Sequence, residues 1–343
     1  MAADRADLLT HLLEQVSRSF YLTLRILPAP VSRQIGLAYL LARTTDTVAD
    51  TELVPLEQRL DLLRQLRERI LGHHNKPLEL KELARRQGTP AERVLLERVE
   101  ESLALLNDFS ATDQAHIREV LRVISSGQEL DLNRFSKASV RNIVSLRTDA
   151  ELDDYTYRVA GCVGEFWTRL CRAHLFPEAS LEESALLADA VRFGKGLQLV
   201  NILRDIPGDL RQGRCYLPAE ALARVGLRPE ALLSPAVEPS LRPLYHRYLA
   251  RARDHLEAGW AYTLALPREA GRVRLGCAWP ILLGVGTLNA LSTQNMLDPA
   301  HRIKVGHGAV RGMLWRSVVR YPFRRWWGKL FEEAARPLRQ LDT

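Results

Sequence analysis

The sequence predicts an all-α protein, and three observations support that class. Apolar residues recur every three or four positions over most of the 343 residues, which is the spacing of a helix with one buried face. Runs in which apolar and polar residues alternate, as in strands, are scarce. The composition of 46% hydrophobic and 26% charged residues is that of an ordinary globular protein with a sizeable core. We expect one helical domain over residues 1–300, followed by a basic, aromatic segment over residues 301–343.

Helices are expected wherever this spacing runs unbroken, with proline or glycine between them. The pattern begins at Leu8, continues over residues 60–70 and is repeated over residues 95–106. Stretches rich in turn-forming residues should mark the connections. They fall at Pro28–Pro30, Gly72–Pro77, Gly88–Pro90, Phe176–Ser180, Pro207–Gly213 and Leu227–Pro239.

A first acidic pair lies in the segment from Tyr39 to Asp50. Asp46 and Asp50 are four residues apart, so both carboxylates project from one face of a helix, together with Arg43 and Tyr39. Two like charges at this spacing destabilise a helix. Mg²⁺ would offset that repulsion, because it accepts one or two carboxylates and leaves coordination positions for substrate phosphates. An exposed acidic face with Arg43 as its ion-pair partner is the alternative.

A second acidic pair repeats the pattern farther along the chain. Asp205 and Asp209 are again four residues apart, Arg204 is adjacent, and Asn201 adds a neutral oxygen one turn earlier. The dipeptide 207–208 is Pro-Gly, so the helix should end or bend between the two aspartates. Two such pairs can face each other across a helical bundle and hold a metal–diphosphate cluster.

Four segments, in this order and spacing, resemble the squalene/phytoene synthase family, the head-to-head prenyl transferases. They are Ser17–Phe20, Tyr39–Asp50, Tyr155–Gly164, and Gln198–Asp209 followed by Gly213–Pro218. The resemblance runs from about Ser17 to Gly308. It implies a single-domain isoprenoid-synthase helical bundle, with the two aspartate motifs on opposite walls of a deep apolar cavity, and a prenyl diphosphate as substrate.

The resemblance also implies roles for individual residues, and the chemistry agrees, since guanidinium groups pair bidentately with phosphate. The residues implied to bind Mg²⁺ are Asp46, Asp50, Asn201, Asp205 and Asp209. Those implied to contact the substrate diphosphate are Ser17, Ser19, Arg43, Arg204 and Tyr216. Those implied to line the reaction face are Tyr39, Tyr155 and Tyr157. Each of the three tyrosines could equally be a helix residue that touches the core.

The sequence departs from the family at three positions. Both motifs usually carry a further acidic residue directly before the last aspartate, where this chain has Ala49 and Gly208. Many relatives have a tyrosine where this chain has Arg158, so a catalytic tyrosine would be Tyr157 or Tyr155.

The family shares a first half-reaction, in which two C15 or C20 prenyl diphosphates form a cyclopropylcarbinyl diphosphate. A region of this chain is similar to the one that squalene synthases use to reduce that intermediate, and there Arg302 and Lys304 would hold the 2′-phosphate of NADPH. We therefore expect two farnesyl diphosphates to be converted to squalene. Gly213–Pro218 looks more like the phytoene and dehydrosqualene type, so a non-reductive product, or presqualene diphosphate itself, is the alternative. The region in question comprises Cys277–Pro280, Gly284–Leu288 and Arg302–Gly306.

The net charge of +7 lies entirely in the last 43 residues. Residues 1–300 carry 38 basic and 38 acidic side chains, whereas residues 301–343 carry 10 and 3. This distribution disfavours a nucleic-acid-binding protein, whose charge would spread over the fold. The same charge distribution is compatible with an alternative function, that of a non-enzymatic helical scaffold that docks on membranes and binds lipid.

Aromatic residues accompany these charges and predict a membrane-interfacial helix, which Pro322 should kink or split. A terminal helix packed on the core is the alternative. The arginines Arg316, Arg320 and Arg324 form an adjacent stripe. The apolar positions, spaced by four, are Trp315, Val319, Phe323, Trp327 and Phe331.

The remaining features predict a cytoplasmic protein at a membrane surface. Met1–Leu12 does not resemble a signal peptide, and the longest apolar run, Leu275–Leu291, is interrupted by Gly, Thr and Asn, so we expect no transmembrane span. The cysteines are scattered without a CxxC pair, which indicates a reducing compartment. They are Cys162, Cys171, Cys215 and Cys277.

Overall fold

Helices make up most of the computed structural model, which describes residues 8–17, 20–51, 54–87, 89–300 and 303–339. Within these residues the only strands are β1 (Val144–Ser145) and β2 (Arg214–Cys215), which pair in parallel with Val144 opposite Arg214. The predicted all-α class is therefore confirmed. The chain separates into two compact units, residues 1–136 with 166–179 (unit 1) and residues 137–165 with 180–343 (unit 2).

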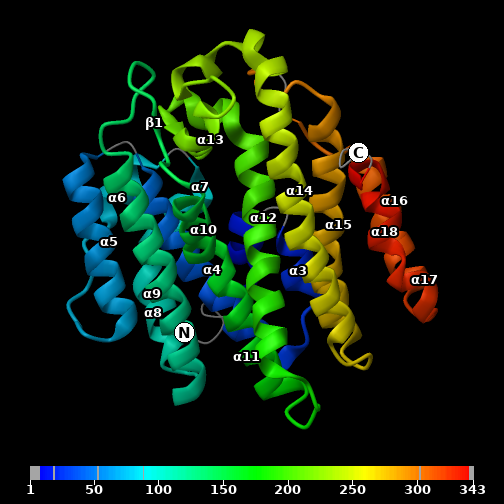
Figure 1. The fold of residues 1–343 in the computed structure, drawn as a ribbon. Helices are drawn as coiled ribbons and strands as arrows, with labels where there is room; N and C mark the ends of the chain where they lie inside the picture. Colours follow the sequence, from blue (N-terminus) through cyan, green and yellow to red (C-terminus); the bar gives the residue numbers. More distant parts are fainter. Residues whose placement is uncertain (1–7, 18–19, 52–53, 88, 301–302, 340–343) are drawn as a thin grey trace. The chain divides into compact units, whose positions relative to one another are not determined.

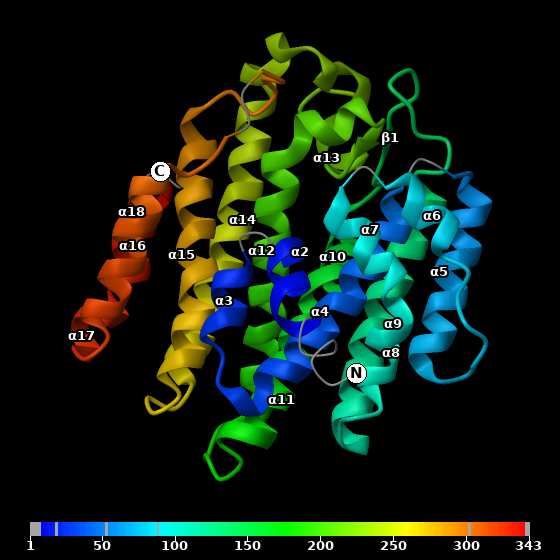
Figure 2. The same cartoon turned by 180° about the vertical axis from the view of Figure 1, so that it is seen from behind.

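Unit 1 is built around α4 and α9, which pack on each other and on α5 (Figure 2). The Ser110 side chain accepts a hydrogen bond from the Asp113 N–H and so caps the start of α9. Gly72, at a φ of 79°, ends α5 in the left-handed conformation that glycine adopts without strain. Its elements are η1 (Leu8–Leu12), α2 (Leu13–Ser17), α3 (Tyr21–Ile26), α4 (Ala29–Asp50), α5 (Leu56–Leu71), α6 (Lys81–Arg86), α7 (Pro90–Glu97), α8 (Val99–Leu106), α9 (Ala111–Arg134) and the later part of α11 (Cys162–Leu175).

Unit 2 is dominated by α12, α14 and α15, which lie side by side as long helices (Figure 1). All four cysteines of the chain are buried and free. Besides the strands, the elements of unit 2 are α10 (Asp149–Thr156), η3 (Tyr157–Gly161), α12 (Glu183–Arg211), α13 (Ala219–Ala223), η4 (Pro229–Leu233), η5 (Pro235–Val237), α14 (Glu238–Ala265), α15 (Gly271–Thr293), α16 (His307–Arg320), α17 (Arg324–Gly328) and α18 (Leu330–Arg339).

Two glycines let η3 and the start of α11 approach α12 closely. A Cβ on Gly164 would lie 2.0 Å from the carbonyl oxygen of Ala190, and one on Gly194 would lie 2.2 Å from that of Ala160. Any side chain at either position would force these backbones apart. The contact holds Tyr157, at the start of η3, against α12.

The helix that carries the second acidic pair does not end at Pro207. The structure keeps Pro207 and Asp209 inside the continuous α12, so the expectation that the helix ends between the two aspartates is wrong. Proline cannot donate to the carbonyl of Leu203, one turn earlier. The hydroxyl of Tyr245 on α14 donates to that carbonyl instead, at 3.1 Å, and replaces the missing backbone hydrogen bond. Tertiary packing thus compensates for the proline.

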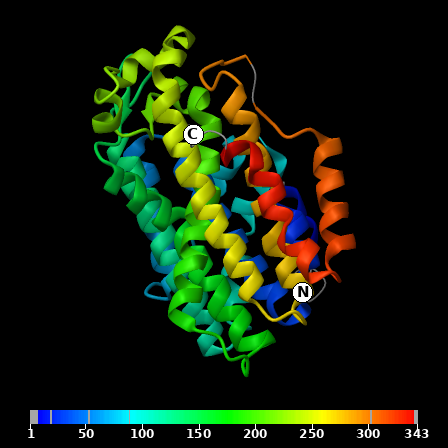
Figure 3. The same ribbon diagram turned by 45° about the vertical axis from the view of Figure 1, so that its right-hand side comes forward.

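The segment after residue 303 is helical and packs on α14 and α15 (Figure 3). Pro322 splits it as expected, because α16 ends at Arg320 and α17 begins at Arg324. The single apolar face predicted for it is wrong, since Trp327 and Phe331 are buried while Trp315 and Phe323 are exposed.

One helix among the described residues, α15, is long and apolar enough to cross a membrane. Its most apolar window is 61% buried inside the structure. A helix in the core of unit 2 would pass the same test of length and composition, and most of this stretch of α15 is buried.

Candidate active site: two acidic pairs and their arginines

The first acidic pair lies at the end of α4 in unit 1, held by a charge network that includes a second helix. Arg43 donates from Nη1 to Asp46 and from Nη2 to Oε1 of Glu92 on α7, the latter at 2.7 Å. Asp50 follows Asp46 by one turn and is exposed. Arg43 is therefore shared between a carboxylate of its own helix and one of a neighbour.

An N-cap residue, Thr89, fixes the position of Glu92. Thr89 precedes α7 and its side chain accepts a hydrogen bond from the Glu92 N–H at 3.3 Å, while its hydroxyl donates to Glu92 Oε2 at 2.6 Å. Glu92 is the functional candidate that sequence reasoning missed. The Thr-Pro-Ala-Glu stretch predicts the cap, but nothing in the local sequence indicates that its glutamate pairs with Arg43 on another helix.

The electrostatics of this pair favour a bound cation. The pKa of Asp46 is raised to about 6. Burial is the larger cause and the negative charge of Asp50 is the second, although Arg43 opposes the shift. For Arg43, the carboxylates of Asp46 and Glu92 outweigh burial and raise its pKa above the usual value, so the guanidinium stays charged. Its Nε is buried and has no hydrogen-bond partner within the described part of the chain. One guanidinium does not neutralise the three nearby carboxylates.

The second acidic pair lies near the end of α12 in unit 2. Arg204 binds Asp205 through two hydrogen bonds, from Nε to Oδ1 at 3.1 Å and from Nη2 to Oδ2 at 2.7 Å. Asp209 lies one turn later on the same helix and is half-buried. Asn201 lies one turn earlier, is exposed, and donates to the side chain of Gln198 at 3.5 Å. The structure thus places all of these predicted residues on one continuous helix.

Two of the predicted tyrosines meet in unit 2. The rings of Tyr155 and Tyr216 stack with their centroids 4.8 Å apart, and the Tyr155 hydroxyl donates to that of Tyr216 at 3.5 Å. Both side chains are buried. The family resemblance implies a place on the reaction face for Tyr155 and a diphosphate contact for Tyr216, and in the structure the two side chains touch each other.

Tyr157 lies in a different environment, beside a half-buried lysine. Its hydroxyl donates to Glu165 at 3.4 Å, and the Lys195 ammonium lies 5.8 Å from its ring centroid. Lys195 also donates to Asp153 at 2.7 Å, and Asp153 accepts from Arg251 as well. Although burial opposes it, these two cations lower the pKa of Asp153. Sequence analysis did not single out Lys195, because its partners come from another helix.

The remaining candidates of unit 1 lie near its amino-terminal helices. Tyr39 stacks on Phe20 with a centroid separation of 5.5 Å and donates weakly to the Val16 carbonyl at 3.5 Å. The Ser17 hydroxyl is buried without a hydrogen-bond partner among the described residues. Such a group is costly unless a ligand or water binds it. Ser19 lies outside the described residues.

The region predicted to serve reduction is divided between the core and the surface. Cys277 and Gly284 are buried along α15, and Pro280 is accommodated within that helix. Lys304 is exposed, and Arg302 lies outside the described residues.

No group of three or more histidine, cysteine or acidic side chains is gathered for a metal ion in the described ranges. The two acidic pairs nevertheless fit Mg²⁺ by donor chemistry. They offer hard oxygen ligands from two carboxylates per helix, and the repulsion that raises the pKa of Asp46 would be relieved by a divalent cation.

Comparison with known proteins shows the family. The family described as "Squalene/phytoene synthase" matches residues 13–307, and the chain belongs to this family of prenyl-transferring enzymes. It is 33% identical over 236 residues, 68% of this chain and 71% of the relative, to presqualene diphosphate synthase of Rhodopseudomonas palustris. It is 27% identical over 311 residues to squalene synthase of Saccharomyces cerevisiae, covering 89% of this chain and 66% of that protein.

Solved structures share the fold. TcSQS in complex with a ligand superposes with a TM-score of 0.73 at 21% identity, covering 96% of this chain and 97% of that one. Squalene synthase HpnC from Alicyclobacillus acidocaldarius gives 0.56 at 18% identity, over 81% of this chain and 92% of that one. The isoprenoid-synthase fold expected from the sequence is therefore confirmed.

Proposed function

We propose that this protein condenses two molecules of farnesyl diphosphate head to head, through presqualene diphosphate, to squalene, with Mg²⁺ and NADPH. One observation carries the proposal. Each unit presents an aspartate pair on one helix with an arginine bound to its first aspartate, Arg43 to Asp46 and Arg204 to Asp205. The family relationship supplies the substrate class, which is a prenyl diphosphate.

In this proposal the charged residues stabilise the leaving diphosphate. Mg²⁺ bound by Asp46, Asp50, Asp205 and Asp209, with Asn201, would neutralise the diphosphate as it departs. Arg43 and Arg204 place fixed positive charges beside the diphosphate. Such charges accelerate its departure, because negative charge develops on the leaving group in that step. The unpaired Arg43 Nε and the buried Ser17 hydroxyl are donors available to diphosphate oxygens. Ser19 and Tyr216 complete the proposed diphosphate contacts.

The tyrosines act on the carbocation. Aromatic faces attract a nearby cation, so Tyr39, Tyr155 and Tyr157 would stabilise the allylic cation while apolar surroundings exclude water. The stack of Tyr155 on Tyr216 holds the first ring in place. For Tyr157, the Lys195 ammonium already lies over the ring. Tyr155 is therefore the better placed of the two for this role.

The reductive step requires a hydride from NADPH. In the proposal Lys304 and Arg302 pair with its phosphate, and the exposure of Lys304 leaves that ammonium accessible. A second candidate function is favoured by a specific observation: two presqualene diphosphate synthases are 33% and 32% identical to this chain. An enzyme of that kind would stop at the cyclopropyl diphosphate and need no NADPH.

We further propose that the enzyme works in the cytoplasm, attached peripherally to a membrane through its C-terminal segment. Squalene is insoluble in water and must pass into a bilayer. The exposed aromatic residues of that segment, flanked by arginines, support this proposal.

Product analysis tests the proposed reaction. The purified chain is incubated with farnesyl diphosphate and Mg²⁺, with and without NADPH, and the organic extract is analysed by mass spectrometry. A parallel incubation uses geranylgeranyl diphosphate. We expect squalene only with NADPH and from the C15 substrate. Presqualene diphosphate or dehydrosqualene as the only product with NADPH would contradict the squalene assignment. Formation of phytoene would mean that the substrate is the C20 diphosphate. No pyrophosphate release under any condition would contradict the enzyme assignment.

A further inference from the structure

The C-terminal helices α16 to α18 divide into a buried side and an exposed side. Trp327 on the buried side is 2% exposed, and its ring stacks on Trp260 of α14 with centroids 4.9 Å apart. Its Nε1 donates to the Ser317 carbonyl at 3.0 Å, and the guanidinium of Arg274 lies 4.7 Å from its ring centroid. Trp327 therefore ties α17 to α14, α15 and α16 at once.

Further hydrogen bonds fix the same helices to the rest of unit 2. Trp260 Nε1 donates to the Gly328 carbonyl at 3.0 Å, and Trp279 Nε1 donates to the Ser317 hydroxyl at 2.9 Å. Asn289 on α15 donates to the Ala334 carbonyl of α18 at 2.8 Å. The segment is consequently a folded part of unit 2, and any surface that it presents is preformed.

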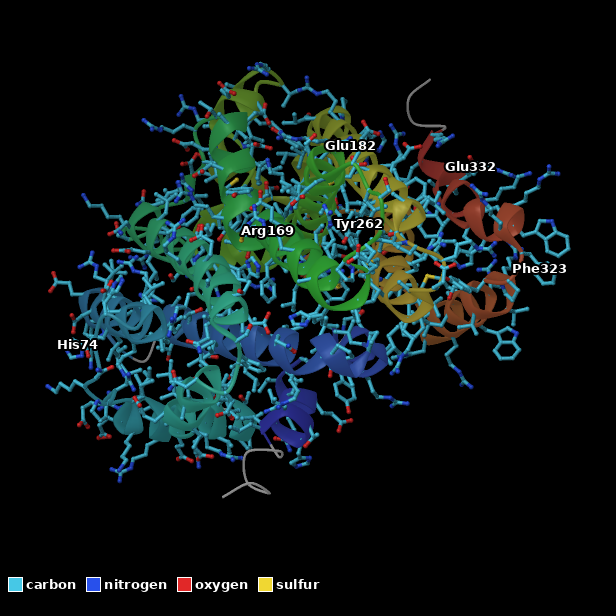
Figure 4. All side chains as sticks on the ribbon, turned by 90° about the horizontal axis from the view of Figure 1, so that it is seen from below. His74, Arg169, Glu182, Tyr262, Phe323 and Glu332 are labelled. Carbon is cyan, nitrogen blue, oxygen red and sulfur yellow. The ribbon has the colours of Figure 1, made fainter. Side chains whose placement is uncertain are left out.

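The exposed side carries large apolar side chains that this packing does not cover. Trp315 is 70% exposed, Trp326 is 60% exposed and Phe323 is 53% exposed. The rings of Phe323 and Trp326 contact each other with centroids 5.2 Å apart. Figure 4 shows Phe323 at the outer edge of these helices, directed away from the rest of unit 2. We call this group the tail patch: Trp315, Val318, Val319, Phe323 and Trp326.

Positive charge surrounds the tail patch. Two acidic residues lie at the start of α18: Glu333 is paired with Arg320 at 2.7 Å, and Glu332 is exposed, so the exposed basic side chains outnumber the acidic ones. Tryptophan and phenylalanine beside arginine and lysine suit the boundary between lipid headgroups and acyl chains, where the polar part carries negative charge. The exposed basic residues next to the patch are Arg311, Arg316, Arg324, Arg325 and Lys329.

We propose that the tail patch is a preformed docking site for an anionic lipid bilayer, with its aromatic side chains inserted at the interface and the surrounding basic residues on the headgroups. The proposal deepens the peripheral membrane attachment suggested above, and names the side of the segment that faces the lipid. Trp327 and Phe331, which the sequence placed on the same face, serve instead as the anchor within the protein. Docking then needs no folding of the segment on the membrane.

Vesicle binding tests the proposal with the full chain. Co-sedimentation is measured with phosphatidylcholine vesicles that contain or lack 30–40% phosphatidylglycerol (roughly the anionic share needed for a strong surface potential). The test variant combines Trp315→Ser, Phe323→Ser and Trp326→Ser. The matched control combines Val140→Ser and Leu233→Ser, which remove exposed apolar side chains of unit 2 outside the patch.

We expect the wild type and the control to bind anionic vesicles, with binding lost in high salt and weak on neutral vesicles. The triple variant should bind at least about tenfold more weakly, with an unchanged thermal midpoint because the Trp327 anchor is intact. Equal binding by the triple variant, or equal binding to neutral vesicles, would overturn the proposal. The proposal would also be overturned if the wild-type protein self-associated through the tail patch and did not bind vesicles. Pyrophosphate release by wild type in a vesicle-free assay reports the proposed function separately, so either can fail alone.

Discussion

The two acidic pairs have the same spacing but different support. Asp46 and Asp50 lie on α4, where Arg43 also binds Glu92 from α7, so a second helix takes part in the charge network. Asp205 and Asp209 lie on α12, and Arg204 binds Asp205 from the adjacent position. The first pair is held electrostatically from a neighbouring helix. The second depends on the continuity of its own helix.

If both pairs bind a metal–diphosphate group, as we propose, this difference gives each pair its own requirement. The first pair needs the shared arginine, because without it Asp46, Asp50 and Glu92 would repel one another. The second pair needs the backbone between its aspartates to stay helical across Pro207, and the Tyr245 hydroxyl provides that support. The predictions below test these two requirements, beginning with the largest expected effect.

Removing the arginines should give the largest loss of activity. Arg43→Met and Arg204→Met each remove a fixed positive charge near the proposed leaving group, and we expect pyrophosphate release to fall by about 10²-fold for either. Single-turnover assays with farnesyl diphosphate measure the effect. Arg33→Met on α4, an exposed residue outside the pair, is the control. Normal rates in both arginine variants would remove the leaving-group role.

Removing the Tyr245 hydroxyl should destabilise the protein near the second pair. In Tyr245→Phe the carbonyl of Leu203 is left without its donor in a buried position, which costs about 1–3 kcal/mol. Urea unfolding measures the loss, and amide exchange should rise along α12 near the proline. Tyr248→Phe is the matched control on the same helix, because its hydroxyl bonds to Asp149, which Arg251 also binds. Unchanged exchange on α12 would contradict the compensation for Pro207.

Unit 1 should lose stability in acid through a buried carboxylate outside the pair. Asp113 accepts from His174 at 2.7 Å and from Gln34 at 3.3 Å, and these hydrogen bonds outweigh burial and lower its pKa. Because the folded-state pKa is below the unfolded value of about 3.9, the stabilisation is present above that value and lost as the pH falls below it. Unfolding between about pH 2 and 5, a range that brackets the ordinary carboxyl pKa, should show a smaller pH dependence in Asp113→Asn. An identical dependence would contradict this assignment.

Neutralising Glu92 should have the smallest effect and should be specific to the first pair. Glu92→Gln keeps an oxygen that accepts from Arg43 and removes one negative charge, so we expect turnover to change by only about 3- to 10-fold. Glu97→Gln, an exposed change on the same helix, is the control and should be neutral. A loss as large as that of Arg43→Met would mean that Glu92 itself contacts the reacting groups.

The sequence predicted the features that depend on local spacing. Helical periodicity indicated the fold class, and the four-residue separation placed the two aspartates of the first pair on one face of a helix, as α4 confirms. It failed where a partner comes from a distant helix. The Tyr245 hydroxyl that supports α12 belongs to α14, and the carboxylate that shares Arg43 belongs to α7. In the C-terminal segment, spacing alone could not tell that Trp260 would bury Trp327 while Trp315 stayed exposed.

The measurement that tests the central claim most directly compares the first aspartate of each pair. Pyrophosphate release from farnesyl diphosphate is measured over a range of Mg²⁺ concentrations for wild type, Asp46→Asn and Asp205→Asn, with Asp61→Asn on α5 as the exposed control. We predict that both pair variants lose about 10²-fold in rate, as the arginine variants do, and need more Mg²⁺, while the control behaves as wild type. Near-normal release by either pair variant at wild-type Mg²⁺ would contradict the claim that both pairs bind the metal–diphosphate group.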